Sequence, residues 1–296
     1  QLPNETGWFM ASLHLLKNES LRAVLAPLTS GRASTHIRPT IAAIYITRFC
    51  NSRCNMCDFW KNEADPSELS SEQWGVVFSR LKAFGVDFVG VNASGEMFTR
   101  RDVFDLLGHI RALGMGFGVN SNATLFTPTR AKKLAALGPR AVTIGLDGVG
   151  DASYMVTRGL KNGFTKVSRH IDNLQREGIE NIGIGSVLMK ENVYEWVSLA
   201  EFALEKKLSG VRFTAYHDAY FNPQSDPVGS EYLDPTFHAL VERQIDKLIE
   251  LGTSAGGRLF WEVTGDRTLR VYAEPTYDFN PLVLTSDKTL KYTGGA

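Results

Sequence analysis

Short apolar runs alternate along this sequence with segments in which apolar residues recur every three or four positions. Runs such as Ile41–Ile46 and Val86–Val91 have the length of buried strands. Segments such as Val103–Ile110, with apolar residues at i, i+3, i+4 and i+7, predict amphipathic helices. The alternation continues from about residue 41 to residue 264 without a low-complexity tract. We therefore expect one main α/β domain.

Capping signals support the predicted helix boundaries. Ser70 with Gln73 fits a capping box, and Gly85 fits the end of the same helix. Thr127 and Pro128 fit the N-cap and the first position of a later helix. The other expected boundary residues are Gly114 and Gly138 as helix ends, Asn192 with Glu195 as a cap for the helix through Lys206, and Asp234–Pro235 as the start of a helix to Leu251.

Strands that alternate with helices imply a parallel sheet with right-handed crossovers. Six or seven such units suit an incomplete barrel, so we predict a partial (β/α)6 TIM-like barrel of parallel strands at 39–252. A short helical or irregular N-terminal lead-in (1–38) and a small C-terminal extension (253–296) are expected around it. The predicted strands are Ile41–Arg48, Phe88–Val91, Gly116–Asn120, Ala141–Leu146, Ile182–Leu188, Val211–Ala215 and, last, Leu259–Thr264.

Charge and composition narrow the class of protein. Lys plus Arg and Asp plus Glu are balanced at 32 each, so bulk electrostatics give no reason to expect nucleic acid or an anionic membrane as a partner. No apolar run approaches the roughly 20 residues of a membrane-spanning helix. The segment Gln1–Lys17 has no basic leader, so we expect a soluble, cytoplasmic protein.

The three cysteines of the chain lie within eight residues, in the run Cys50-Asn-Ser-Arg-Cys54-Asn-Met-Cys57. A disulfide framework is not distributed in this way, and a metal site explains the cluster better. The run begins where the first predicted strand ends, which is the edge at which β/α barrels carry their chemistry. Three thiolates on a four-iron cluster would leave one iron free for a small molecule. Zinc held by the three cysteines and one of six histidines is the alternative.

A CxxxCxxC run after a first strand resembles the radical S-adenosylmethionine (SAM) superfamily. The resemblance implies a [4Fe–4S] cluster on Cys50, Cys54 and Cys57, whose open iron takes the amino and carboxylate groups of SAM. It also implies an external one-electron donor such as flavodoxin or ferredoxin.

Further segments at the ends of later strands are similar to the family's SAM-binding segments. Ser94-Gly95-Glu96-Met97 resembles Gly-Gly-Glu-Pro, in which Gly95 allows close backbone approach and Glu96 accepts the SAM ammonium. Ser121-Asn122-Ala123-Thr124 resembles Thr-Asn-Gly-Thr, and Gly145-Leu146-Asp147-Gly148 resembles Ser-Leu-Asp-Gly. The residues that the resemblance assigns to SAM are Met56 against the adenine, Gly95, Glu96, Asn122, Thr124, Arg158 and Ser186.

Several of these assignments have open alternatives. Arg158 can fork onto the SAM carboxylate or form a structural salt bridge. Gly145 departs from the family's serine and lacks a side chain to contact SAM. Phe59 and Trp60 can wall the pocket or pack in the core, and Asp147 is expected to be structural or to face the substrate. The segments place the chain nearest to the subgroup that includes the molybdenum-cofactor enzyme and the SPASM enzymes.

Polar residues after the sixth predicted strand are candidates for acid, base or substrate-anchoring roles. Tyr216, His217 and Asp218 would lie at the barrel mouth, although a surface turn also explains them. All three cysteines are used by the first cluster, so none remains for auxiliary clusters or as a hydrogen-atom donor. Tyr216 or Tyr220 is the substitute donor to consider.

The sequence therefore predicts a biosynthetic enzyme that cleaves SAM reductively and abstracts a hydrogen atom from a substrate. We expect a small molecule of natural-product or carbohydrate type as the substrate, with a peptide as the alternative. Two other classes remain open: a non-catalytic zinc-binding β/α protein and a ferredoxin-like electron carrier. The carrier would not need the Gly95–Glu96 and Asn122–Thr124 segments.

Overall fold

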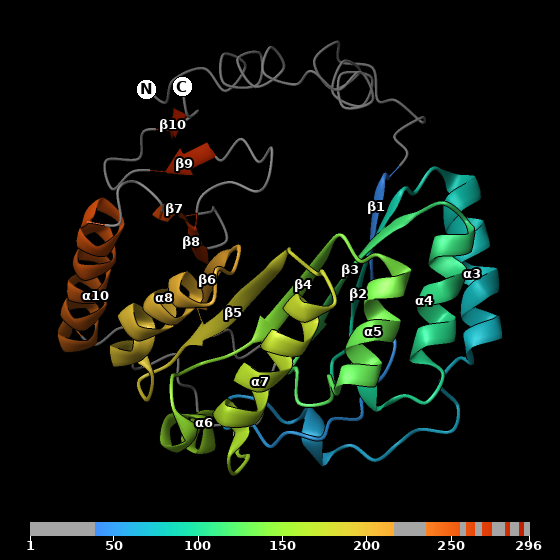
Figure 1. Ribbon diagram of the computed structural model, residues 1–296, viewed down its shortest axis with the longest axis horizontal. Helices are drawn as coiled ribbons and strands as arrows, with labels where there is room; N and C mark the ends of the chain where they lie inside the picture. Colours follow the sequence, from blue (N-terminus) through green and yellow to red (C-terminus); the bar gives the residue numbers. More distant parts are fainter. Residues whose placement is uncertain are drawn as a thin grey trace.

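A mostly parallel sheet forms the centre of the computed structural model, which describes residues 39–215, 235–254, 259–263, 268–273, 282–284 and 290–292 (Figure 1). Its strand order is β1-β2-β3-β4-β5-β6-β8-β7. The first six strands pair in parallel in chain order, and β8 and β7 continue the sheet antiparallel. The six are β1 (Ile41–Tyr45), β2 (Phe88–Asn92), β3 (Gly116–Ser121), β4 (Ala141–Gly145), β5 (Ile182–Leu188) and β6 (Gly210–Ala215).

The remaining strands belong to the chain after residue 258. They are β7 (Leu259–Val263), β8 (Thr268–Ala273), β9 (Leu282–Leu284) and β10 (Leu290–Tyr292), of which the last two pair with each other. The predicted last strand therefore exists, but it does not pair with β6, because the antiparallel strand β8 lies between them. Six parallel strands with alternating helices form the partial α/β barrel that the sequence predicted.

Helices connect the parallel strands and lie side by side along the sheet (Figure 1). In three of the connections, a short 3-10 turn lies between the strand and the helix that follows it. The helices are α3 (Ser71–Phe84), α4 (Val103–Ala112), α5 (Pro128–Leu137), α6 (Asp151–Arg158), α7 (Gly163–Arg176), α8 (Trp196–Glu205) and α10 (Pro235–Ser254), and the turns are η1 (Phe59–Lys61), η2 (Met97–Thr99) and η3 (Val193–Glu195).

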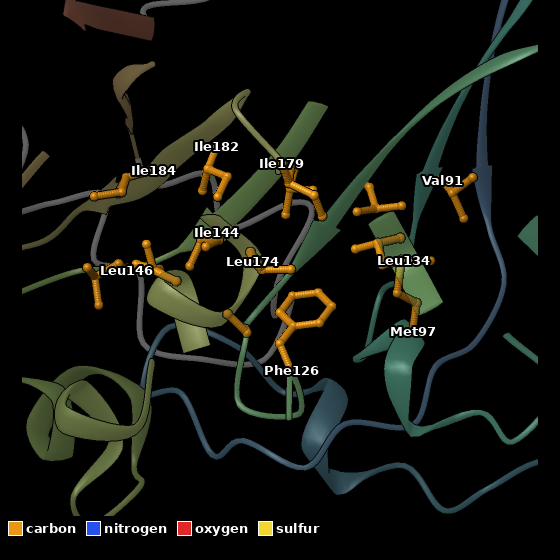
Figure 2. Close-up of a cluster of buried hydrophobic side chains, with 14 of the residues drawn as sticks. Val91, Met97, Phe126, Leu134, Ile144, Leu146, Leu174, Ile179, Ile182 and Ile184 are labelled. Carbon is orange, nitrogen blue, oxygen red and sulfur yellow. The ribbon is translucent and has the colours of Figure 1, made fainter. Parts of the chain in front are cut away.

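The hydrophobic core lies between the sheet and these helices. Alternate strand residues such as Val91, Ile144 and Ile182 are buried there, as the two-residue period of a strand requires. In Figure 2, Ile144 and Ile182 lie on the side of Leu174 of α7, and Val91 lies on the side of Met97 and Leu134 of α5. The intervening residues point to the other face of the sheet, and several of them are exposed or half-buried.

Local capping chemistry confirms most of the expected helix ends. Ser70 and Gln73 form both bonds of the capping box on α3, and Gly85 ends that helix with a φ of 111°. Thr127 accepts from the main chain of α5, which has Pro128 at its first position.

Two expectations about helices were wrong. Asn192 makes no cap bond, because its side chain accepts from the Met189 amide and donates to the Val187 carbonyl, closing the turn after β5. Glu195 likewise does not cap α8, because its carboxylate accepts from the Val149 amide. Helix α6 was not foreseen; of its eight residues, Tyr154 and Thr157 are buried.

No helix in the described part of the chain is long and apolar enough to cross a membrane. The predicted lead-in at 1–38 lies outside the described residues.

Candidate functional site

The cysteine run follows β1 and crosses the edge of the sheet where the parallel strands end, next to α6 (Figure 1). Cys54 is buried, Cys50 and Cys57 are half-buried, and none of the three is in a disulfide. Ser52 donates its amide to the Cys50 Sγ at 3.5 Å, and Phe59 donates to the Cys57 Sγ at the same distance. The loop is therefore shaped so that backbone amides face two of the sulfur atoms.

Main-chain hydrogen bonds hold the start of the cysteine loop against the end of β2. The Gly95 amide donates to the Thr47 carbonyl at 3.2 Å, and the Glu96 amide donates to the Phe49 carbonyl at 2.8 Å. A β-carbon at Gly95 would lie 1.9 Å from the Phe49 oxygen. Glycine is thus required here by close backbone approach, which is the reason that the sequence suggested for it.

The other side of the cysteine loop rests on the C-terminal end of α6. The Arg53 amide donates to the Arg158 carbonyl at 3.2 Å, and the Asn55 amide donates to the Thr157 carbonyl at 3.1 Å. Gly159, with a φ of 65°, lies so close that a β-carbon there would be 2.3 Å from the Arg53 oxygen. Helix α6 is therefore a structural support of the loop.

Side-chain amides tie the cysteine loop to the segment after β3. The Asn122 Nδ2 donates to Asn51 at 2.8 Å and to Ser52 at 2.9 Å, while its Oδ1 accepts from the Thr124 hydroxyl at 2.7 Å. Asn51 closes the ring by donating to Thr124 at 2.8 Å. Ala123 between them has a φ of 56°, a conformation that favours glycine. The predicted residues Asn122 and Thr124 thus meet two residues that the sequence did not single out.

Glu96 is almost fully buried and already has three hydrogen-bond donors. Its Oε1 accepts from the Ser121 hydroxyl at 2.8 Å and the Phe98 amide at 3.0 Å, and its Oε2 accepts from the Asn122 amide at 2.6 Å. Burial raises the pKa of Glu96, and these hydrogen bonds oppose that shift. The carboxylate connects the ends of β2 and β3, and Oε2 still has a lone pair for another donor.

Arg158 forms an ion pair with Asp147, with 2.5 Å between Nε and Oδ2. Asp147 is fully buried and also accepts from the Val187 amide at 2.7 Å and from the Ser186 hydroxyl at 3.3 Å. The Nη1 of Arg158 lies 4.0 Å from the Cys54 Sγ. Burial disfavours the charged guanidinium, but Asp147 and Cys54 outweigh it and raise the pKa of Arg158. The structural salt bridge left open by the sequence is therefore present.

Sulfur-containing side chains gather beside this ion pair. Met56 and Cys54 pack with Met189, and Cys57 and Val187 border the group. Burial raises the pKa of all three cysteine thiols, that of Cys50 to about 11. Ligation of iron must therefore displace protons from thiols that are neutral at pH 7.

The three free thiols and the buried cation of Arg158 beside Cys54 fit a cluster held by three cysteines. Among the described residues, no three His, Cys, Asp or Glu side chains are grouped as ligands of a single metal ion.

Phe59 and Trp60 lie in η1, half-buried and outside the core. The guanidinium of Arg48 lies 5.8 Å from the Phe59 ring centroid, and that of Arg53 lies 5.8 Å from the Trp60 centroid. These contacts favour a role at the rim of the site over core packing.

The structure brings together Met56, Gly95, Glu96, Asn122, Thr124, Arg158 and Ser186 around the three cysteines. Tyr216, His217 and Asp218 lie outside the described residues, as does Tyr220. Reasoning from sequence missed Asn51, Ser52 and Met189. The amide and hydroxyl inside the Cys50–Cys54 spacing were the available signal for the first two, whereas Met189 carries none.

Comparisons with known proteins identify a family that matches this chain. The family model described as the radical SAM superfamily matches residues 44–203, more than half of the chain. Fe-coproporphyrin III synthase from Methanosarcina barkeri is 29% identical over 187 residues, which are 63% of this chain and 46% of that protein. Mycofactocin maturase MftC from Mycolicibacterium smegmatis is 32% identical over 158 residues, or 53% of this chain and 39% of that protein.

A solved structure shares the fold. The crystal structure of Streptococcus suis SuiB bound to precursor peptide SuiA has a TM-score of 0.61 and 18% identity, and the match covers 80% of this chain and 51% of SuiB. The chain thus spans about half the length of the proteins that it resembles, or less. With the family model matched over most of the barrel, the chain belongs to the radical SAM superfamily of enzymes, which use a [4Fe–4S] cluster and SAM.

Proposed function

We propose that this enzyme abstracts a hydrogen atom from a carbon of an organic substrate bound beside the cysteine loop. When bound, the cluster supplies one electron that cleaves SAM into methionine and a 5′-deoxyadenosyl radical, which takes the hydrogen atom. The observation that carries the proposal is the set of three free thiols at the edge of the sheet, braced by the ends of β2, β3 and α6.

The protein's own residues have distinct tasks in this proposal. Cys50, Cys54 and Cys57 hold the cluster. Oε2 of Glu96 and the backbone at Gly95 receive the SAM ammonium, because a buried acceptor favours a cation. Arg158 keeps its Nη groups for the SAM carboxylate while Nε stays on Asp147.

Four further residues complete the proposed SAM pocket. Met56 packs softly on the adenine, and its contacts with Met189 support that place. Asn122, Thr124 and Ser186 supply polar groups at the ends of β3 and β5.

Tyr216, His217 and Asp218 follow the last residue of β6 in the sequence. We propose them as substrate anchors or as an acid and base at the barrel mouth. An external one-electron donor such as flavodoxin or ferredoxin is proposed to reduce the cluster.

For the substrate we propose a small molecule of natural-product type, which the relative named Fe-coproporphyrin III synthase supports. A peptide is the second candidate. Its support is the structural neighbour SuiB, whose crystal structure contains a precursor peptide.

The test is anaerobic reconstitution with iron and sulfide, followed by reduction in the presence of SAM. The wild-type protein is expected to be brown and to form 5′-deoxyadenosine, whereas Cys50→Ala, Cys54→Ala and Cys57→Ala each lose both properties. These are the only cysteines of the chain, so no other thiol can take over. A variant with wild-type iron content and turnover would contradict the ligand assignment. The reaction is then repeated with deuterated candidate substrates. Deuterium in the 5′-deoxyadenosine product identifies the substrate that donates the hydrogen atom.

A further inference from the structure

Helix α7 carries two buried polar side chains on a face that is otherwise apolar. His170 and Asn173 are 4% and 5% exposed, and Val167, Ile171 and Leu174 are buried on the same helix. Residues three apart lie on one face of a helix, so the two polar side chains are neighbours. Buried polar groups need hydrogen-bond partners, and the partners of these two indicate what this face of α7 holds.

Both side chains bind main-chain carbonyls of the loop between β3 and α5. The Nδ1 of His170 lies 2.7 Å from the Ala123 oxygen, and the Nδ2 of Asn173 donates to the Phe126 oxygen at 3.0 Å. A carbonyl only accepts, so the Nδ1 of His170 carries the hydrogen atom. Burial lowers the pKa of His170, so the ring is neutral at pH 7 and uses its one N–H in this bond.

The carbonyl that His170 binds belongs to a peptide unit that also faces the Asn122 side chain. This trans peptide joins the Ala123 oxygen and the Thr124 amide, which point in opposite directions. His170 binds the oxygen, and the Asn122 Oδ1 accepts from the amide at 3.0 Å. Ala123 has a left-handed φ of 56°, which is unfavourable for a residue with a β-carbon. The bond from His170 therefore helps to hold this peptide in its orientation.

The Asn122 side chain connects this peptide to the cysteine loop. Because its Oδ1 faces the Thr124 amide, its Nδ2 faces the other way and donates to Asn51 at 2.8 Å and to Ser52 at 2.9 Å. A flipped amide would leave the Thr124 N–H without this acceptor and would turn an oxygen toward the Asn51 oxygen. A chain of contacts thus runs from α7 through one peptide and one side-chain amide to the cysteine loop.

We infer that His170 is a positioning residue for the reaction proposed above. Its bond to Ala123 fixes the direction of the Asn122 amide and thereby holds the cysteine loop in the shape that retains the cluster. The inference rests on the proposed function, because it takes this loop as the cluster-binding loop. Asn173 differs from His170, because the peptide that follows Phe126 donates its N–H to the Leu125 oxygen at 2.9 Å and does not reach the cysteine loop.

The test measures the rate at which the full chain, reconstituted anaerobically with its cluster, loses iron to a chelator. His170→Leu keeps a side chain of similar size without a donor and is expected to release iron about fivefold faster, the effect of about one hydrogen bond. His170→Asn places an amide donor at the position of Nδ1 and is expected to stay within about twofold of the wild-type rate. Asn173→Leu removes a similar buried bond from the same helix face, and this control is also expected within about twofold.

The dependence on Asn122 is tested by combining substitutions. In an Asn122→Ala background, His170→Leu is expected to change the release rate by less than about twofold, because the amide that His170 orients is gone. A role in global stability alone would give the full effect in both backgrounds. Urea unfolding checks that each variant folds. His170→Met, with a more flexible apolar side chain, takes the place of His170→Leu if that variant does not fold.

Four results overturn the inference: release at the wild-type rate in His170→Leu, equal acceleration in His170→Asn, equal acceleration in Asn173→Leu, or the full effect of His170→Leu in the Asn122→Ala background. Iron release needs no turnover of SAM, so formation of 5′-deoxyadenosine by the wild type tests the proposed function separately. A wild type that holds the cluster without cleaving SAM removes the proposed reaction and leaves the role of His170 in the loop to the iron measurement. A wild type that holds no cluster removes both.

Discussion

The guanidinium of Arg158 lies on the main chain of Gly145, so closely that a β-carbon at Gly145 would be 2.7 Å from Nη1. The absence of a side chain at Gly145 thus makes room for the ion pair between Arg158 and Asp147. A position that the family pattern fills with serine is here occupied by part of an arginine from α6.

Gly145→Ser is therefore expected to displace Arg158 and to destabilise the protein by about 1–3 kcal/mol, as overpacking does. Urea unfolding measures the effect. Gly185→Ser is the matched control, because Gly185 is the register partner of Gly145 and its β-carbon would meet Thr143 at an ordinary 3.4 Å. Equal effects of the two substitutions would show that Arg158 is not the cause.

Asn122→Ala is expected to loosen the cysteine loop, because it removes the two hydrogen bonds to Asn51 and Ser52. Loss of about 1 kcal/mol per bond, about 2 kcal/mol for the two, predicts release of iron to a chelator faster by up to roughly thirtyfold. Asn62→Ala is the control, since Asn62 bonds only to the nearby Phe59 carbonyl within η1. Iron release at the wild-type rate in Asn122→Ala would contradict the bracing role.

Glu96→Ala is expected to weaken SAM binding by about tenfold while iron content stays near that of the wild type, because the carboxylate addresses the ammonium and not iron. Glu96→Gln keeps the size and one acceptor, so its affinity should lie between the two. SAM titration against the cluster absorbance gives the affinity. An unchanged dissociation constant in Glu96→Ala would exclude this role.

Stability at low pH should depend on Asp102. Although partial burial opposes it, hydrogen bonds and charge from Arg100 hold the pKa of Asp102 below its usual value of 3.8. A depressed pKa in the folded state contributes stability above the unfolded pKa and loses it as pH falls through the folded pKa. The stability difference between wild type and Asp102→Asn should therefore shrink as pH falls from 6 to below 3.8. A difference that is constant with pH in urea unfolding would contradict it.

Much of the fold follows from local chemistry that the sequence displays. The capping box at Ser70, the proline at Pro128 and the apolar face of Val103–Ile110 each act within a few residues, so they were predicted correctly. The prediction that Asn192 caps a helix was wrong, because its side chain forms hydrogen bonds within the turn after β5 and not with the helix that follows. Local propensity does not reveal such competition.

The candidate site likewise contains residues that the sequence singled out and contacts that it could not predict. Spacing singled out the cysteines as proposed cluster ligands, and resemblance singled out Gly95 and Glu96 as proposed SAM-binding residues, whose positions at strand ends follow from the alternation of strands and helices. The contacts of Arg158 with Asp147 and Gly145 join α6 to the end of β4 and depend on tertiary structure, so the sequence left the salt bridge as one of two options.

Main-chain hydrogen bonds join Thr47, Phe49, Arg53 and Asn55 to the end of β2 and to α6, so the protein itself supplies contacts that order the cysteine loop. Ordering one residue costs about 1–2 kcal/mol of conformational entropy, and here the folding of the barrel meets that cost. Binding of the cluster then costs little further conformational entropy in the loop. We expect the cluster to assemble and dissociate as a ligand of a folded protein, without unfolding transitions of the loop.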